Sequence, residues 1–171
     1  MKQQPTPWCD FERLENEVIQ QFACGEWSAH GPSHWRRVLQ NGIWISRRSG
    51  ADPWVVRLFA WFHDSKRIND VSDPGHGRRG ARYAAELRGT VFDLPDESFD
   101  KLTYACAWHT DKDLTDDPTI GTCWDADRMD LGRVGVTPSA RFMSTQFGKQ
   151  AADAGSFFTL LDEDEIAENT G

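Results

Sequence analysis

The 171-residue sequence lacks an apolar run of membrane-spanning length, and its polar N-terminus lacks the apolar core of a signal peptide. We therefore expect a cytoplasmic protein with no membrane partner. The four cysteines form no Cys-x-x-Cys pair and no zinc-ribbon spacing, so we interpret them as reduced, mostly buried thiols. A Gly-rich phosphate loop and a Ser or Cys nucleophile with a paired base are also missing, which disfavours covalent catalysis.

Positive charge is scarce, because 19 Lys and Arg stand against 27 Asp and Glu and leave a net charge of −8. An acidic protein repels the phosphate backbone, so long nucleic acid is not an expected partner. The charge is uneven, however. Residues 65–82 contain only two acids, Asp70 and Asp73, beside the basic residues Lys66, Arg67, Arg78, Arg79 and Arg82. This local excess of cations favours a small anionic ligand.

Runs of alternating, β-branched residues are missing as well, whereas helical periodicity recurs along the chain. We expect helices over about 10–23, 32–48, 53–63, 75–88, 96–109, 118–131 and 138–152. A polar loop is expected at 66–75, and an acidic tail from about 162 is expected to fray. The sequence thus predicts an all-α fold, a single compact domain over 1–171 with about six to seven helices.

Histidine is rare, and all five histidines fall near the end of an expected helix or in an adjoining loop. They are His30, His34, His63, His76 and His109. A lone histidine is usually structural or at the surface. The ends of several elements can converge on one cleft, however, and site residues gather in such places. Five histidines at element ends therefore favour a functional site.

The dipeptide His63-Asp64 directly follows the apolar run 54–62. A charged group at the end of a buried segment costs free energy if it has no partner, and a divalent cation removes that cost. Neutral imidazole and carboxylate suit Zn, Mn or Fe, and the carboxylate also suits Mg. The dipeptide therefore predicts a metal site of unspecified metal.

Three segments occur in a characteristic order: His34 in His-Trp-Arg-Arg-Val, then His63-Asp64, then Asp-Ala-Asp-Arg-Met-Asp at 125–130. This order resembles the HD-domain superfamily of metal-dependent phosphohydrolases, over roughly residues 28–135. The resemblance implies an all-helical fold and a metal held by His34, His63, Asp64 and Asp127.

The choice of Asp127 rests on its neighbours. The superfamily usually places this ligand after a small residue and before Arg or an apolar residue, as in Ala126-Asp127-Arg128. Asp125 lies about 200° around a helix from Asp127. We therefore expect it to face elsewhere, either behind a ligand or at the surface.

Two further histidines resemble ligand positions of HD subfamilies that bind two metals. His76 opens His-Gly-Arg-Arg-Gly-Ala, and His109 follows Ala-Trp. The resemblance implies one or two divalent ions (Mn, Mg, Co, Ni, Zn or Fe), with Asp64 as the bridging carboxylate if two are bound. The alternative is that both histidines bind phosphate without a second metal. His30 is left open between a metal ligand, a residue that supports a ligand from behind and a substrate contact.

Roles in catalysis and binding follow from this hypothesis. The candidate catalytic residues are Asp64, Lys66 and His109. The candidate substrate-binding residues are His30, Lys66, Arg67, Arg78 and Arg79, because guanidinium groups form bidentate hydrogen bonds with phosphate oxygens. The alternative is that individual cations pair in solvent with Asp70, Asp73 or Glu86.

The preferred function is a phosphohydrolase (phosphatase, nucleotidase or phosphodiesterase) that uses metal-activated water on a small phosphate ester or nucleotide. One alternative is a di-iron oxygenase of the HD type with a small anionic substrate, because its ligand order is the same. Another is a non-catalytic HD module for ligand sensing. The sequence lacks the Gly-Tyr-Pro signature of cyclic-di-GMP phosphodiesterases. It leaves open the substrate, the metal and whether the chain forms a homo-oligomer.

Overall fold

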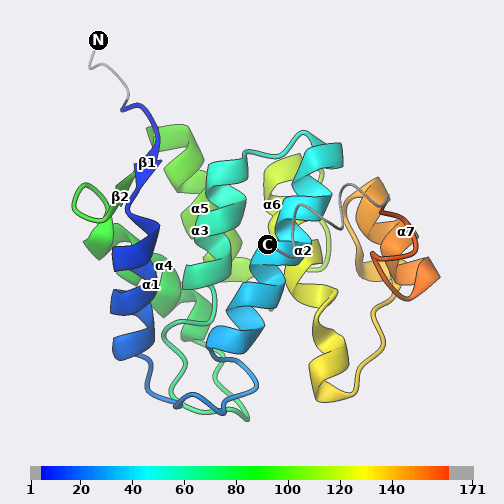
Figure 1. The fold of residues 1–171 in the computed structure, drawn as a ribbon, viewed down its shortest axis with the longest axis horizontal. Helices are drawn as coiled ribbons and strands as arrows, with labels where there is room; N and C mark the ends of the chain where they lie inside the picture. Colours follow the sequence, from blue (N-terminus) through cyan, green and yellow to red (C-terminus); the bar gives the residue numbers. More distant parts are fainter. Residues whose placement is uncertain (1–4, 162–171) are drawn as a thin grey trace.

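Helices make up nearly all of the regular structure in the computed structural model, which describes residues 5–161 (Figure 1). The α-helices are α1 (Phe11–Gln20), α2 (Pro32–Ser49), α3 (Pro53–Phe62), α4 (His76–Leu87), α5 (Asp96–Trp108), α6 (Pro118–Arg128) and α7 (Gln146–Ala154). Two 3-10 helices, η1 (Leu131–Val134) and η2 (Ala140–Phe142), follow α6. The strands β1 (Trp8–Cys9) and β2 (Phe92–Asp93) form one short antiparallel pair. The predicted all-α fold is confirmed.

Helix α3 is the central element of the core. It begins at Pro53, where the Asp52 carboxylate accepts a hydrogen bond from the Trp54 backbone N–H, as at a typical helix N-terminus. Its apolar residues face all directions and are buried, because α2, α5 and α6 pack around it. The helix ends at Phe62. A largely buried helix therefore delivers His63 and Asp64 to the interior.

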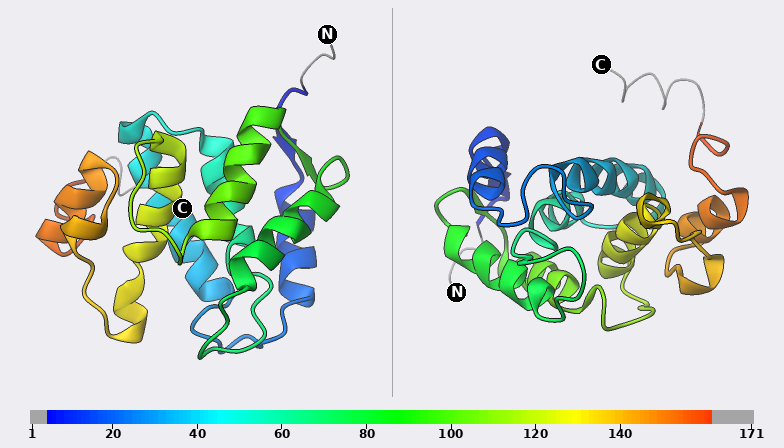
Figure 2. Two further views of the ribbon diagram at one scale, coloured as in Figure 1. Left: turned by 180° about the vertical axis from the view of Figure 1, so that it is seen from behind. Right: turned by 90° about the horizontal axis from the view of Figure 1, so that it is seen from below.

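The ends of five helices converge at one end of the bundle. Helices α2 and α4 begin there, and α3, α5 and α6 end there, at the lower edge of Figure 1. Segments 21–31 and 63–75 cover this end, as the view from below in Figure 2 shows. The two segments are joined by a hydrogen bond of 2.5 Å between Ser28 Oγ and Asp70 Oδ1. The bundle thus gathers residues from distant parts of the sequence at this end.

Two glycines let α4 approach its neighbours closely. A Cβ atom on Gly77 would lie 2.2 Å from the Cys106 carbonyl oxygen of α5. A Cβ atom on Gly80 would lie 2.2 Å from the Phe62 carbonyl oxygen at the end of α3. Only glycine fits at such contacts. The close packing brings the first residue of α4, His76, towards the ends of α3 and α5.

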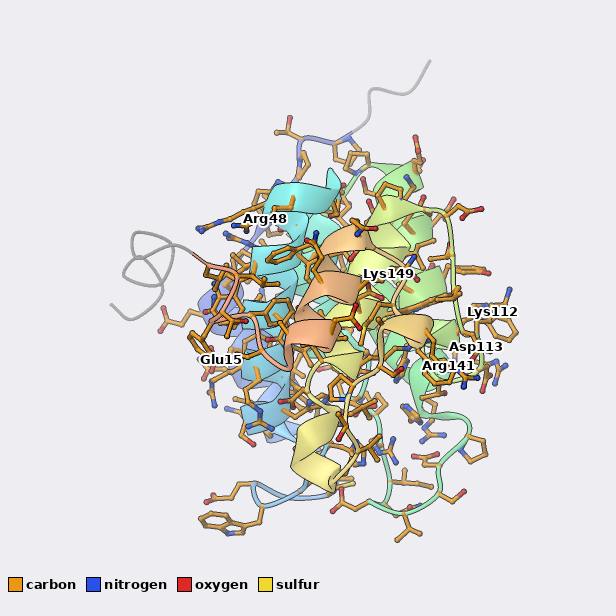
Figure 3. The ribbon with its side chains drawn as sticks, turned by 90° about the vertical axis from the view of Figure 1, so that its right-hand side faces the viewer. Glu15, Arg48, Lys112, Asp113, Arg141 and Lys149 are labelled. Carbon is orange, nitrogen blue, oxygen red and sulfur yellow. The ribbon has the colours of Figure 1, made fainter. Side chains whose placement is uncertain are left out.

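The last helix starts later than expected. The predicted helix over 138–152 is wrong at its beginning, because α7 covers only Gln146–Ala154. The Thr145 side chain accepts a hydrogen bond from the Gly148 N–H and so fixes the start of the helix. Helix α7 covers one side of the bundle, where the Arg48 guanidinium lies 4.4 Å from the Phe147 ring centroid (Figure 3).

Three other expectations concern membrane spans, cysteines and the acidic tail. Among residues 5–161, no helix is both long enough and apolar enough to cross a membrane. All four cysteines are free thiols, and Cys106 and Cys123 are buried. The predicted acidic tail from about 162 lies outside the described residues.

Candidate metal centre

His34, His63 and Asp127 form one group of converging side chains at the end of the bundle. They come from the beginning of α2, the end of α3 and the end of α6. The Nε2 atoms of His34 and His63 are 3.1 Å apart. Asp127 Oδ1 lies 3.2 Å from His34 Nε2 and 3.8 Å from His63 Nε2. This group could hold one metal ion.

Asp64, His76 and His109 form a second group. The Nε2 atoms of His76 and His109 are 3.0 Å apart. Asp64 Oδ1 lies 3.0 Å from His76 Nε2 and 3.5 Å from His109 Nε2. All three residues are buried. The two histidines come from the beginning of α4 and the end of α5, where Gly77 allows the two helices to touch.

The Asp64 carboxylate joins the two groups. Its Oδ1 faces His76 and His109, whereas its Oδ2 lies 3.7 Å from His34 Nε2 and 3.8 Å from His63 Nε2. The two oxygens of one carboxylate therefore point to different sets of imidazoles. This is the arrangement that a carboxylate bridging two ions requires.

The tautomers of the four imidazoles favour a cation at this site. Each Nδ1 atom has an acceptor close by: Asp130 for His34, the Phe59 and Ala60 carbonyls for His63, the Asp73 carbonyl for His76 and the Cys106 carbonyl for His109. Protons on Nδ1 would leave the Nε2 lone pairs free to bind a cation, and the Nε2 atoms face one another in both groups. Bare lone pairs at such distances repel, and a shared cation removes the repulsion.

The Asp64 carboxylate also favours a bound cation at this site. Its Oδ1 is buried and has no hydrogen-bond donor of suitable geometry among the described residues. Buried polar atoms are normally satisfied, and a divalent ion would satisfy this one. Buried histidine and aspartate are suitable ligands for Zn, Mn or Fe. The residues present therefore fit one or two metal ions, without fixing their identity.

The protonation preferences of the site are those of metal ligands. Burial lowers the pKa of His63 to about 3, so this imidazole is neutral near pH 7. Burial alone would raise the pKa of Asp64, but the surrounding imidazoles, with His63 first, hold it well below its usual range. The pKa of Asp127 is also lowered, because the effect of its hydrogen bond with His34 outweighs that of burial. A neutral imidazole beside two carboxylates is ready to bind a cation.

Asp130 holds His34 from the side opposite the cluster. Its Oδ2 lies 2.7 Å from His34 Nδ1, and Arg37 donates to both of its oxygens, at 2.7 and 3.0 Å. Such carboxylate contacts orient a ligand histidine and raise its basicity. Neither Asp130 nor Arg37 was predicted from the sequence to have a role. Arg37 follows His34 by one helical turn, a spacing that could have indicated a shared partner.

Asp125 serves a different purpose from Asp127. Its carboxylate accepts hydrogen bonds from Ser144 N, Thr145 N and Thr145 Oγ1, at 2.7, 2.8 and 2.7 Å. It is fully buried and anchors the segment that leads into α7. It therefore faces away from the cluster, as expected, but it lies in the interior and not at the surface.

His30 lies at the rim of the cluster, before the start of α2. Its Nδ1 is 3.0 Å from Asp64 Oδ2 and 3.3 Å from Arg133 Nη2, and its side chain is 17% exposed. Arg133, in η1, also donates to the Ala29 and Asp130 carbonyls. No sequence pattern pointed to Arg133, because it lies outside both the motifs and the basic region. It adds a cation on the side of the site formed by α6 and η1.

Among the predicted cationic residues, Arg67 lies in the cluster. Its Nη1 is 3.6 Å from Asp64 Oδ1 and 3.4 Å from His76 Nε2, and its side chain is 7% exposed. A guanidinium held at this position can donate to the oxygens of an anion bound at the cluster.

The other three cations are directed elsewhere. The Lys66 ammonium lies 3.8 Å from the centroid of the Tyr83 ring, away from the Asp64 carboxylate that precedes it in the chain. Arg78 pairs with Asp111 at 3.0 Å and stacks on the Trp108 ring. Arg79 pairs with Asp73 at 2.5 Å and donates to the Lys66 carbonyl. The geometry of Arg79 thus matches the alternative given for the basic residues, in which a cation pairs with Asp73.

These observations define an all-helical domain with a buried His and Asp cluster suited to two metal ions. The chain is similar to a crystal structure of a predicted HD superfamily hydrolase from an uncultured Thermotogales bacterium, with a TM-score of 0.65 and 25% sequence identity over 94% of this chain and 92% of that chain. No family model and no curated protein matches the sequence. The chain has the HD-type helical fold, and its buried His and Asp groups are compatible with an HD metal site.

Proposed function

We propose that this protein is a metal-dependent phosphohydrolase acting on a small phosphate ester or nucleotide. The observation that carries the proposal is the pair of three-ligand groups joined by Asp64. The similarity to a predicted HD superfamily hydrolase supports a hydrolase at a coarse level. Divalent ions held there would lower the pKa of a bound water and polarise a phosphoryl oxygen.

Other residues of the chain would bind the substrate and stabilise its charge. Arg67 would donate to the phosphoryl oxygens and stabilise their charge, since it is fixed beside Asp64 and largely shielded from water. His30 would contact the substrate at the more open rim of the cluster. Arg133 would hold the segment that contains His30, residues 21–31, through its hydrogen bond to the Ala29 carbonyl. The local cations favour an anion of limited size, because the net charge of −8 repels long polyanions.

The test is a screen of nucleotides, sugar phosphates and generic phosphate esters with protein loaded with Mn, Mg, Co, Ni, Zn or Fe. We expect metal-dependent release of phosphate or of a phosphomonoester. The variants His63→Ala and Asp64→Ala should lose bound metal and activity, whereas Asp111→Ala, which changes an exposed acid outside the cluster, should keep both. Full turnover and full metal content in either cluster variant would contradict the proposal.

A di-iron oxygenase is the second candidate, because the same two ligand groups suit two irons. Metal analysis of protein purified without chelator separates the two functions. About two equivalents of iron, with oxygen consumed and no ester hydrolysed under any metal, would favour the oxygenase. Hydrolysis with other divalent ions would favour the phosphohydrolase.

A further inference from the structure

Arg133 in η1 is held by contacts at all three nitrogen atoms of its guanidinium group. Its Nε donates to the Ala29 carbonyl at 2.8 Å, and its Nη1 donates to the Asp130 carbonyl at 3.0 Å. Its Nη2 lies 3.3 Å from His30 Nδ1, and the side chain is only 10% exposed. Two backbone carbonyls thus fix the guanidinium group, and its remaining nitrogen is directed at the His30 ring.

The contact with Arg133 determines where the proton of His30 can lie. A guanidinium group can only donate hydrogen bonds. A neutral imidazole carries one proton, so its Nδ1 can accept from Arg133 only when that proton is on Nε2. His30 Nε2 makes no hydrogen bond with the part of the chain that the structure describes, and the side chain keeps 17% of its surface exposed. The Arg133 contact therefore favours an Nε2–H group that is available to a ligand.

Asp64 competes with Arg133 for the same nitrogen atom. Its Oδ2 lies 3.0 Å from His30 Nδ1, and an ionised carboxylate can only accept, so this contact requires the proton on Nδ1. A neutral imidazole cannot make both hydrogen bonds at once. The same Oδ2 also faces His34 and His63, where the first group of candidate ligands could hold an ion. When Asp64 binds cations, its lone pairs are directed to them, and Arg133 becomes the preferred partner of Nδ1.

We propose that Arg133 is a positioning residue that sets the tautomer of His30. In the metal-bound protein, Nδ1 accepts from Arg133 and Nε2 carries the proton, whereas in the metal-free protein Nδ1 donates to Asp64. The imidazole stays neutral, because one proton leaves Nδ1 for water as another binds Nε2. His30 then offers an N–H donor at the rim of the cluster, so it meets an acceptor oxygen of the phosphate ester. This last step rests on the proposed function, whereas the tautomer rests only on the contacts of His30 and on metal binding.

The tautomer can be measured directly by ¹⁵N NMR. Long-range correlations between the carbon-bound protons and the two nitrogen atoms of an imidazole distinguish a protonated nitrogen from one with a free lone pair. The experiment uses ¹⁵N-labelled protein at about pH 8, where imidazoles are normally neutral, first loaded with Zn and then treated with a chelator. His30→Asn identifies the signals of His30. We expect the proton on Nε2 in the Zn-loaded protein and on Nδ1 after removal of the metal.

Arg133→Met is the informative variant, because methionine keeps much of the side-chain length and donates no hydrogen bond. In the Zn-loaded protein it should lose the preference for a proton on Nε2, so that both tautomers of His30 are populated. Arg141→Met is the matched control. Arg141 lies in η2, and its guanidinium group packs 4.5 Å from the Phe142 ring centroid, so its removal should leave the His30 signals as in the wild type.

Kinetics at saturating metal test the contact with the substrate. Loss of one hydrogen bond from an uncharged donor should lower kcat/KM for a phosphate ester about three- to tenfold, in both Arg133→Met and His30→Asn. The double variant should be no slower than His30→Asn alone, because Arg133 acts through His30. Additive losses would assign Arg133 a separate structural role and overturn the proposal.

Three NMR results would also overturn it. They are a proton on His30 Nδ1 in the Zn-loaded wild type, a Zn ion bound directly to that nitrogen, and a tautomer that does not change in Arg133→Met. If the wild type hydrolyses no phosphate ester under any metal, the proposed function fails, while the NMR measurement still decides whether Arg133 sets the tautomer.

Discussion

The imidazole of His34 is fixed at both of its nitrogen atoms. Its Nε2 faces His63 and Asp127, and its Nδ1 contacts Asp130. Burial would lower the pKa of His34, but the hydrogen bonds to Asp127 and Asp130 raise it. Without a cation, the His34 ring is thus hydrogen-bonded to both carboxylates. A metal ion would replace the proton on the Nε2 side and leave the contact with Asp130 intact.

Asp130→Ala should weaken metal binding while leaving the ligands in place. Loss of a carboxylate that orients a ligand histidine typically lowers metal affinity about 10- to 100-fold. The measurement is a competition titration with a chelator of known affinity. Arg37→Ala should have a smaller effect in the same direction, since Asp130 keeps its contact with His34. Unchanged affinity in Asp130→Ala would show that the contact does not orient the ligand.

Arg67→Ala should impair catalysis without loss of metal. Hydrogen bonds to charged groups contribute about 1.5–3 kcal/mol, so kcat/KM for a phosphate ester should fall roughly 10- to 100-fold. Metal affinity should be kept or increase, because a positive charge 3.6 Å from Asp64 Oδ1 is removed. Steady-state kinetics and metal titration measure the two effects.

The matched control is the double variant Arg78→Ala, Arg79→Ala. Both guanidinium groups belong to the basic region predicted from the sequence, but their ion pairs with Asp111 and Asp73 direct them away from the cluster. We expect near-normal kcat/KM in this variant. If it loses as much activity as Arg67→Ala, the basic region acts as a whole, and the geometric distinction between its members fails.

At the scale of residues, the sequence allowed prediction of the groups that a motif contains. His34, His63, Asp64, His76, His109 and Asp127 do converge. Their roles remain predictions. Lys66 shows why adjacency in sequence is not enough, since the chain turns after Asp64 and its side chain leaves towards Tyr83. Arg133 could not be found, because only the packing of η1 against the His30 loop brings it close.

At the scale of elements, the site depends on helix ends being held in place. Asp125 connects α6 to the start of α7 through three buried hydrogen bonds. It stands two residues before Asp127, so one helix end carries both an anchor for α7 and a metal ligand. The two acids should respond differently to the same substitution.

Asp125→Ala should destabilise the protein by about 2–4 kcal/mol, because it leaves buried donors of Ser144 and Thr145 without an acceptor. The folded fraction should still bind metal with the wild-type stoichiometry. Asp127→Ala should show the reverse, with a lowered metal content and a smaller change in stability. Urea unfolding and metal analysis of each variant provide the comparison. Loss of metal in Asp125→Ala under conditions where the protein is folded would contradict this division.

Gly77→Ala should disrupt the second ligand group through the backbone. Its Cβ would lie 2.2 Å from the Cys106 carbonyl oxygen and 3.1 Å from His109 Nδ1, so α4 must move away from α5. Overpacking of this kind costs about 1–3 kcal/mol, and it would separate His76 from His109. We expect lower stability and loss of about one equivalent of metal.

Gly132→Ala is the control for this substitution, because nothing lies within 4 Å of the Cβ position there. It should keep both the stability and the metal content of the wild type. Wild-type metal content in Gly77→Ala would mean that α4 adjusts without moving His76, and the close approach would then have no part in building the site.

Helix positions were largely predictable because glycine and proline mark their ends. Pro32, Pro53 and Pro118 begin α2, α3 and α6, where a fixed φ and a missing N–H suit the first helical residue. Pro138 suggested the same for the last helix, and there the prediction failed. The start of α7 depends on the Thr145 side chain and on Asp125, 20 residues earlier. Local sequence does not contain that long-range contact.

At the scale of the whole molecule, the candidate metal ligands bring several elements of the bundle together at one end. The candidate ligands come from α2, α4, α5 and α6 and from the residues that follow α3. Without metal, this end buries several carboxylates and imidazoles close to one another. Binding of cations there should therefore stabilise the folded state as a whole and not only order a loop. Whether the chain is a single domain over 1–171 stays a prediction.

Removal of metal should lower the melting temperature of the entire protein. A ligand at 100 times its dissociation constant stabilises the folded state by about 2.7 kcal/mol, and 1 kcal/mol shifts the melting temperature of a domain of this size by roughly 2–4 °C. We therefore expect a decrease of roughly 5–10 °C on treatment with a chelator, reversed by excess metal. Differential scanning calorimetry of the wild type and of His63→Ala measures the effect. The variant should melt at the same temperature with and without chelator, because it lacks a central ligand. A wild-type protein that contains metal, yet melts at one temperature in both states, would show that the cluster does not bind metal in its folded form more tightly than the unfolded chain does.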